Sequence, residues 1–491
     1  MAQLMKTPGV SVEEITSFGS SVAPVATAIP AFLGFTNNHS NLTSGSAGGT
    51  AKLPVRITSF KEYEDTFGKV SNANVSETIT VTAADIVTSG ALTSRTVTTS
   101  TPPSKINLLS YNLQLYFANG GGPCYIVSIG LPSDFDHTSN TRFVAGLNEI
   151  KLVDEPTLLV FPEAYNLDHD KHGNLIQLAT AQAATLQDRF VIADVNSGKQ
   201  AIGDVAGFRA DVNSLNNKYG ALYYPALDTT IPSYFEDDHI TVTQTVDIDG
   251  AGAAPGPYTG RSLKEILQGF TTTGPSPVTF PPNTGLYSAV LGYVNSLTLT
   301  LPASAAIAGV YAQVDDQRGV WKAPANVPLI LVTNPSVKIT DAQQGDLNID
   351  ATAGVSINAI RAFTGKGTII WGARTMDGNS AEWKYINVRR LFIFIEESIQ
   401  KAMQSYVFEP NTAQTWLRLK GTIDNFLTGL WRQGALAGAK PDDAFFVKVG
   451  IGTTMTADDI LNGILNIEIG LAAARPAEFI SLKFSQLQQV S

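Results

Sequence analysis

The sequence has a single cysteine, Cys124, among its 491 residues. One thiol excludes an intramolecular disulfide and any zinc or iron–sulfur site built from several cysteines of one chain. Cys124 begins an apolar stretch, residues 124–129, where it is interpreted as a small hydrophobic side chain. We therefore expect a fold that is held together without covalent crosslinks.

Charge is also scarce, at 15% of the residues. Lys and Arg number 33 against 43 Asp and Glu, and the resulting net charge of -10 disfavours general binding to nucleic acid or an anionic membrane. Hydrophobic residues make up 44% of the chain, which excludes an intrinsically disordered protein. A chain of this length exceeds one ordinary core, so we expect about two or three domains.

Long apolar runs are missing. No stretch reaches the length of about 18 uncharged apolar residues that spans a bilayer, because the most apolar segment, residues 461–474, contains Glu468. The first residues reach Pro8 and Gly9 before any apolar run, so they lack the hydrophobic region of a signal peptide. We expect no transmembrane anchor and synthesis in the cytoplasm.

Motifs of catalytic and nucleotide-binding sites are missing too. The sequence has neither a Gly-x-Ser-x-Gly elbow nor a His-Glu-x-x-His pair. Residues 365–368, Gly-Lys-Gly-Thr, resemble the end of a phosphate-binding loop, but Ile360 stands where its first glycine belongs and Gly367 follows the lysine. The three glycines at 120–122 are interpreted as the end of a helix. These residues point away from an enzyme.

The strongest candidate for a metal site is Asp168-His169-Asp170-Lys171-His172, which follows a predicted strand. Two imidazoles and two carboxylates so close together could bind a divalent metal. The neighbouring Asn and Gly residues are typical of a solvated turn, which is the competing interpretation. A metal-dependent enzyme using Asp168–His172 is therefore kept as an alternative function.

Apolar strands and helices alternate between residues 106 and 224. Helices are predicted at 106–118, 175–186 and 203–215, and strands at 124–129, 157–161, 190–194 and 221–224. Strands separated by helices predict right-handed crossovers and a mainly parallel sheet covered on both faces. The fold class is therefore α/β, in a mixed α/β chain of several domains.

Two segments interrupt this pattern. Ser and Thr dominate residues 76–104, where alternating β-favouring residues predict a β-hairpin insertion, with a disordered linker as the alternative. Residues 237–283 are rich in Gly, Pro and Thr and are predicted to be a second surface insertion.

The C-terminal third predicts two amphipathic helices. The first places Val388, Leu391 and Ile395 on an apolar face, opposite a polar face with Arg389, Glu396, Glu397, Lys401 and Gln404. The second begins after Asn411-Thr412, interpreted as its N-cap, and turns Trp416, Leu419, Ile423 and Phe426 inward. Residues 464–471 and 478–484 are predicted strands.

This third also carries a series of distinctive motifs, which are GVYA at 309–312, RGVWKAPAN at 318–326, INAIR at 357–361, WGART at 371–375, YINVRRL at 385–391, FIEESI at 394–399, FEPN at 408–411, LWRQGAL at 430–436 and RPAEFI at 475–480. Two more motifs stand earlier in the chain, PGVSVEE at 8–14 and YFANGGG at 116–122. In these motifs and their order the sequence closely resembles the tail sheath proteins of contractile phages and related contractile injection systems.

The resemblance implies a structural subunit that polymerises as a helical sleeve around an inner tube and shortens to drive the tube through a target cell envelope. It implies no catalysis and no cofactor or metal. The implied partners are further copies of the chain, the inner tube protein, and baseplate and tail-terminator or cap proteins, without nucleic acid or direct membrane insertion. A phage tail and an extracellular injection particle both fit, and a non-contractile structural protein is the remaining alternative.

For such a subunit we expect an N-terminal arm at 1–20, an outer α/β domain at 21–344 that includes both insertions, and an inner assembly domain at 345–491 with a C-terminal arm. Residues 8–16 and 478–486 are predicted strands that pair with neighbouring subunits. The side chains expected at these contacts are Val10, Val12, Ile15, Phe479, Ile480, Leu482 and Phe484.

The tube contact must hold before contraction and release during it. Exposed charge pairs suit this need, because each contributes only about 0.2–1 kcal/mol and many subunits repeat it. Arg418 and Lys420, on the polar side of the second helix, are the candidates for facing the tube. An ordinary solvated helix face is an equally good interpretation, and residues 456–459, with Asp458 and Asp459, are a rival contact of opposite charge.

Overall fold

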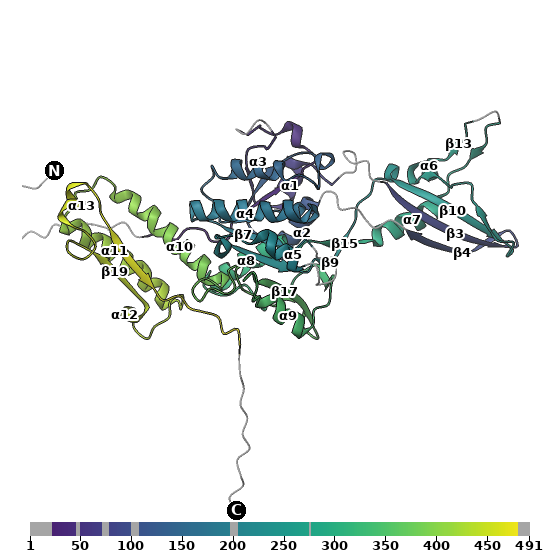
Figure 1. Ribbon diagram of the computed structural model, residues 1–491. Helices are drawn as coiled ribbons and strands as arrows, with labels where there is room; N and C mark the ends of the chain where they lie inside the picture. The colour runs from purple at the N-terminus through teal and green to yellow at the C-terminus, as the bar shows by residue number, and fades with distance from the viewer. Residues whose placement is uncertain are drawn as a thin grey trace, which may run out of the picture. The chain divides into compact units, whose positions relative to one another are not determined.

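In a computed structural model the chain folds into two compact units (Figure 1). The structure describes residues 22–45, 50–70, 78–99, 108–196, 205–273 and 276–479. The large unit comprises Ala26–Ile393 together with the chain after Ala474, and the small unit comprises Phe394–Ala474 together with the chain before Ala26. The boundary between residues 393 and 394 falls within helix α10 (Ile386–Met403).

An eight-stranded sheet forms the centre of the large unit, with the strand order β18-β17-β8-β7-β6-β1-β5-β2. Its strands are β1 (Pro30–Gly34), β2 (Val55–Ile57), β5 (Cys124–Ser128), β6 (Leu158–Val160), β7 (Phe190–Asp194), β8 (Gly220–Tyr224), β17 (Ile357–Phe363) and β18 (Gly367–Ile370). All neighbours from β17 to β5 are parallel, and only β2 and β18 pair in the antiparallel sense. The predicted mainly parallel sheet is confirmed.

Helices connect these strands and pack on the sheet. They are α1 (Phe60–Phe67), α2 (Leu108–Ala118), α3 (Thr141–Ile150), α4 (His169–Leu186), α5 (Val205–Val212), α8 (Ser304–Arg318) and α9 (Asp341–Asn348). Helix α3 packs on β1 and β5 and contacts α4, whereas α2 packs on α8, which contacts β6 and β7. Because the chain moves along the sheet in one direction after β1 and in the other after β5, right-handed crossovers place α2 and α3 on opposite faces.

The segments 365–368 and 168–172, which the sequence analysis compared with a phosphate-binding loop and a metal site, both belong to regular structure. Residues 364–366 form the tight turn between β17 and β18, with Gly365 at φ 79°, so the resemblance to a phosphate-binding loop is a hairpin turn. Residues 169–172 are the first turn of α4 rather than a solvated turn, and the His172 side chain is buried. The helix begins earlier than predicted because its first turn packs against α5.

The two predicted insertions share one sheet. Strands β3 (Ile79–Thr88) and β4 (Ala91–Thr99) form an antiparallel hairpin, and β3 also pairs in parallel with β10 (Ile240–Ile248). The remaining elements are β11 (Ala253–Pro255), β12 (Arg261–Ser262), α6 (Leu263–Gln268), β13 (Phe270–Thr271), β14 (Thr279–Phe280) and α7 (Thr284–Ser296). Ile79, Val242, Leu263 and Val290 are among the residues of a core of its own. We call residues 78–99 and 237–296 the insertion module (Figure 1).

A three-stranded sheet also belongs to the large unit. Strand β9 (Leu227–Pro232) lies between β15 (Thr298–Leu301) and β16 (Val332–Pro335), and all pairs are antiparallel. Ser233 N–H donates to the Leu297 carbonyl over 2.9 Å, so the chain enters and leaves the second half of the insertion module at adjacent points.

The small unit contains the second part of α10, helices α11 (Ala413–Arg432), α12 (Pro441–Ala444) and α13 (Ala457–Leu461), and the antiparallel pair β19 (Phe445–Val449) and β20 (Ile467–Leu471). It begins at Phe394, whereas the sequence placed a domain boundary at 344/345. The difference arises because β17 pairs with β8 and therefore keeps residues 345–393 with the central sheet.

Helix α10 departs from its predicted amphipathic pattern. Arg389 and Glu397 were assigned to the polar face, yet both side chains are buried. The Arg389 guanidinium lies over the rings of Tyr219 and Trp383, at 4.9 and 4.7 Å from their centroids, and Glu397 accepts a hydrogen bond from Lys401. Charged residues with such partners tolerate burial, which a hydrophobic pattern alone does not reveal.

Candidate assembly site

Helix α11 presents two different sides. Leu419, Ile423 and Leu427 are buried, while Arg418 and Lys420 are exposed, as contact with another protein requires. Burial raises the pKa of Asp424, against the effect of Lys420 one turn earlier. The tube-facing role of Arg418 and Lys420 stays a prediction.

The start of α11 differs in detail from the expected cap. Thr412 occupies the N-cap position but its side chain makes no capping hydrogen bond. The Asn411 side chain instead accepts a hydrogen bond from Trp416 Nε1 over 2.6 Å. Asn411 therefore holds Trp416, which is only partly buried, against the end of the helix.

The rival acidic contact, residues 456–459, is the beginning of helix α13. Thr456 Oγ1 accepts from the Asp459 backbone N–H, and the Asp459 carboxylate accepts from the Thr456 N–H, which forms a capping box. Asp459 is thereby engaged at the helix end, and these hydrogen bonds lower its pKa.

Large apolar side chains are exposed on the small unit. They are Val407, Phe408, Leu417, Phe446, Ile451, Leu461 and Ile464. Phe408 is fully exposed and has a positive φ of 71°, a backbone conformation that is costly for an aromatic residue. Several exposed apolar side chains on so small a unit are typical of a surface that other proteins cover.

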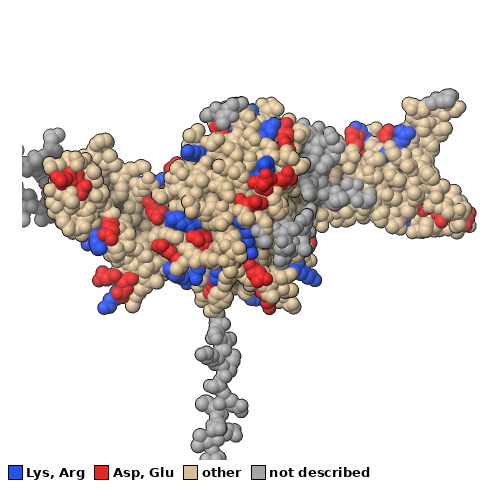
Figure 2. Space-filling view, in the orientation of Figure 1, with Lys and Arg blue, Asp and Glu red and all other residues tan. Residues whose placement is uncertain are grey.

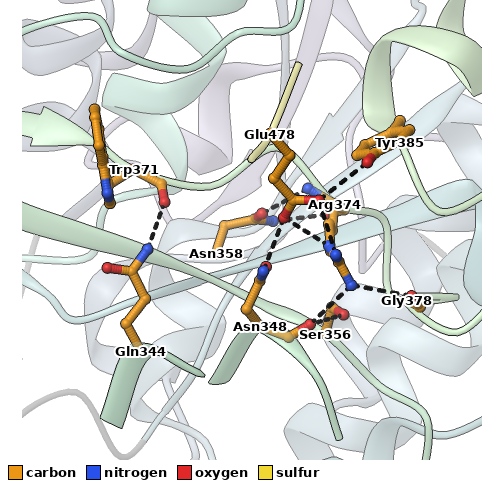
Figure 3. A network of polar contacts seen from close by, with 9 residues as sticks. All are labelled: Gln344, Asn348, Ser356, Asn358, Trp371, Arg374, Gly378, Tyr385 and Glu478. Carbon is orange, nitrogen blue, oxygen red and sulfur yellow. Dashed lines mark hydrogen bonds and ion pairs between the residues drawn. The ribbon is translucent and has the colours of Figure 1, made fainter. Parts of the chain in front are cut away.

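Glu478, the first residue of the predicted C-terminal strand 478–486, belongs to no strand and is instead the centre of a polar network in the large unit (Figure 3). Its carboxylate accepts hydrogen bonds from Arg374 Nε at 2.9 Å and Nη2 at 2.8 Å, from Asn348 Nδ2 at 2.8 Å and from the Tyr385 hydroxyl at 3.0 Å. Burial pushes the pKa of Glu478 upward, but the hydrogen bonds from Arg374 and Asn348 outweigh it and hold the pKa below its usual value.

The predicted arm contacts fall mostly outside the described residues. This holds for Val10, Val12, Ile15, Ile480, Leu482 and Phe484. Phe479 is described, and its side chain is 74% exposed and belongs to no strand.

The candidate metal cluster does not come together as a site. His172 packs against the Phe208 ring at 5.3 Å, and burial lowers its pKa to about 3. His169 also faces Phe208, and Asp168 pairs with His137. No group of three or more His, Cys, Asp or Glu side chains among the described residues could hold a metal ion.

Sequence patterns missed two buried carboxylates at the carboxyl ends of parallel strands. Asp194 ends β7 and accepts hydrogen bonds from the backbone N–H groups of Ala303 and Ser304, at the start of α8. Glu163 follows β6 and accepts from the Phe35 and Leu109 N–H groups. Burial raises the pKa of Asp194 to about 6 and that of Glu163 to about 7. Both carboxylates satisfy backbone donors inside the fold, a role that residue type alone does not signal.

On the face shown in Figure 2, uncharged residues cover most of the surface, and acidic and basic side chains are interspersed. No helix among the residues that the structure describes is long and apolar enough to cross a membrane.

Comparison with known proteins identifies the family. Residues 379–486 match the model of the phage tail sheath C-terminal domain. The tail sheath protein of Burkholderia phage BcepMu is 26% identical over 295 residues, 55% of this chain and 58% of that protein. The tail sheath protein of Vibrio phage KVP40 is 25% identical over 194 residues, 40% of this chain and 28% of that protein. The chain thus matches less than two thirds of the length of these curated relatives.

Solved sheath structures match along nearly the whole chain. The helical sheath of the anti-feeding prophage in its contracted state is 32% identical, with 98% of this chain and 100% of that chain covered and a TM-score of 0.60. The sheath complex of the extracellular contractile injection system PVC, also contracted, is 28% identical, with 99% of both chains covered and a TM-score of 0.63. The chain belongs to the family of contractile tail sheath proteins, which is a family of structural proteins.

Proposed function

We propose that this chain polymerises as a helical sleeve around an inner tube and shortens to drive the tube through a target cell envelope. The observation that carries the proposal is the match to the contracted anti-feeding prophage sheath over 98% of this chain and 100% of that chain. The work of contraction comes from the free-energy difference between two packings of the same subunits, because a packed interface is bistable rather than continuously deformable.

The partners that this function requires are further copies of the chain, an inner tube protein, a baseplate and a cap or tail-terminator protein. A chain of the anti-feeding prophage baseplate structure is 32% identical to this one over 99% of its length, which supports association with a baseplate. The particle is a phage tail or an extracellular injection system, made in the bacterial cytoplasm. No cofactor takes part.

The small unit and the arms at both ends of the chain form the inner, assembling part of the sleeve in this proposal. The exposed apolar side chains of the small unit support this assignment, as does its sheet, in which the described residues form only two strands, β19 and β20. The insertion module lies on the outer side in this proposal, because most residues of its strand β4 are Ser or Thr and its turns are rich in Gly and Pro. Val10, Val12, Ile15, Phe479, Ile480, Leu482 and Phe484 make the arm contacts, and Arg418 and Lys420 face the tube.

Negative-stain microscopy of the purified full chain tests the proposal. We expect striated tubes of uniform diameter, or, on co-expression with the tube protein, longer tubes filled by it. Protein that stays monomeric at high concentration and in the presence of the tube protein would overturn the assignment.

A further inference from the structure

The chain returns to the large unit immediately before its C-terminal segment. Ala474 still belongs to the small unit, where its backbone N–H donates to the Ala435 carbonyl, and the chain from Arg475 onward belongs to the large unit. Among the described residues 475–479, Glu478 is the one that forms hydrogen bonds to other described residues. This one side chain therefore holds the returning segment 475–479, and Phe479 beside it is exposed.

The donors to Glu478 are fixed by the central sheet. Asn358 of β17 accepts from the Arg374 backbone N–H at 2.7 Å and donates to the Arg374 carbonyl at 2.8 Å and to the Leu222 carbonyl of β8 at 3.1 Å. Arg374 Nη1 donates to the carbonyls of Asn348 and Gly378. Contacts that do not involve Glu478 thus orient the Arg374 guanidinium. Its two N–H groups can then donate to both oxygens of a carboxylate in one geometry.

The burial of this pair sets it apart from a surface ion pair. The side chains of Arg374 and Glu478 are 6% and 21% exposed. In the pair between Arg361 and Asp341, on the same unit, the aspartate side chain is 94% exposed. A half-buried carboxylate with four donors holds its position more firmly than an exposed one, whose contribution is small and screened by salt.

We propose that Glu478 is a positioning residue that fixes, on the large unit, the point from which residues 480–491 leave toward a neighbouring subunit. The inference rests on the proposed function, in which this segment pairs with another copy. A tether anchored two residues before the segment limits the volume that the segment samples, and so raises its effective concentration at the neighbour. Arg374, Asn348 and Tyr385 act through Glu478.

The test is a doping assay with the full chain. Fluorescent Glu478→Gln chains are mixed as a minor component with unlabelled wild-type chains, and incorporation into tubes is measured against labelled wild type. We expect incorporation to fall about tenfold, as for the loss of one charge-assisted set of hydrogen bonds. Asp341→Asn, which breaks the exposed pair with Arg361, is the matched control and is expected to incorporate like wild type.

Truncation separates positioning from a general structural role. A chain lacking residues 480–491 should incorporate less than wild type, and adding Glu478→Gln to it should cause no further loss, because the anchor then has nothing to position. A further loss of the same size, or full incorporation of either single variant, would overturn the proposal. Amide hydrogen exchange of residues 475–479 in the unassembled chain should rise in Glu478→Gln and stay unchanged in Asp341→Asn. Absence of tubes from wild-type protein would instead contradict the proposed function itself.

Discussion

At the scale of single residues, the Glu478 network predicts a dependence of stability on pH. Because the folded-state pKa of Glu478 lies below its usual value, the ionised network stabilises the large unit above the unfolded-state pKa of about 4.3 and loses that contribution as the pH falls through the folded-state pKa. The difference in urea midpoint between wild type and Glu478→Gln should therefore be constant near neutral pH and shrink below about pH 4. An equal difference at pH 7 and pH 3 would contradict this.

A second residue-scale prediction concerns the buried pair of Arg390 and Asp315, whose side chains are 3% and 5% exposed. Arg390 also donates to the Thr27 carbonyl and lies over the Tyr311 ring. Arg390→Met should lower the free energy of unfolding by about 3–5 kcal/mol, because it leaves Asp315 buried without its counter-ion. Chemical denaturation measures the loss.

The matched control for this pair is again Asp341→Asn, for which about 0–1 kcal/mol is expected because the Arg361–Asp341 pair is exposed. The double variant Arg390→Met/Asp315→Leu should recover much of the stability, since it removes both charges together. A loss in the double variant as large as in Arg390→Met would show that packing of the Arg390 stem, and not the orphaned charge, sets the cost.

At the scale of elements, helices α2 and α8 approach each other closely at Gly309. A Cβ atom at this position would lie 2.5 Å from the Tyr116 backbone oxygen. Gly309→Ala should therefore force the helices apart and destabilise the large unit by about 1–3 kcal/mol, measured as a shift of its thermal unfolding. Gly345→Ala in α9, where a Cβ meets nothing within 4 Å, should be neutral or stabilising. Equal effects of the two changes would show that the close approach is not rigid.

The predicted contact with the inner tube lies on helix α11. Replacing both Arg418 and Lys420 with Glu should impair co-assembly with the tube protein while the fold persists, because both side chains are exposed and neither belongs to the apolar side of the helix. Sedimentation of tube-filled sheaths at low and high salt measures the effect, which should be larger at low salt. Undiminished tube-filled, extended particles would exclude this helix as the contact.

Helices and strands could be predicted well, because apolar periodicity determines them. The burial of single polar residues could not, because it depends on a specific partner. Strand β7 has the predicted bounds, β8 begins one residue earlier than predicted and α2 ends at the predicted residue, because each is an apolar element inside the sheet layers. The burial of Arg389 and His172 escaped prediction, since it depends on aromatic rings supplied by distant segments. The Glu478 network escaped for the same reason: its donors lie about one hundred residues earlier in the chain.

At the scale of the whole molecule, the insertion module should behave as one body. Replacing residues 78–99 alone by a short linker should expose the core face of β10 and lower solubility, because Ile240 and Val242 lose their cover. Replacing residues 234–296 as well should restore a soluble chain, since Ser233 and Leu297 already lie in hydrogen-bond contact. Circular dichroism and limited proteolysis would compare the two variants, and a well-folded, soluble single deletion would contradict the shared core.

The parallel pairing of β3 with β10 has a consequence for how the chain is made. Ser89 and Asp249, which meet through a hydrogen bond at the tip of the module, are 160 positions apart, and the ribosome adds about 5–20 residues per second. The β3–β4 hairpin is only marginally stable without further strands. During synthesis the edge of β3 that later pairs with β10 therefore stays unpaired while strands β5 to β8 leave the ribosome. These strands can form their own sheet in that time. The insertion module is thus completed after much of the central sheet, although its first strands are made before most of that sheet.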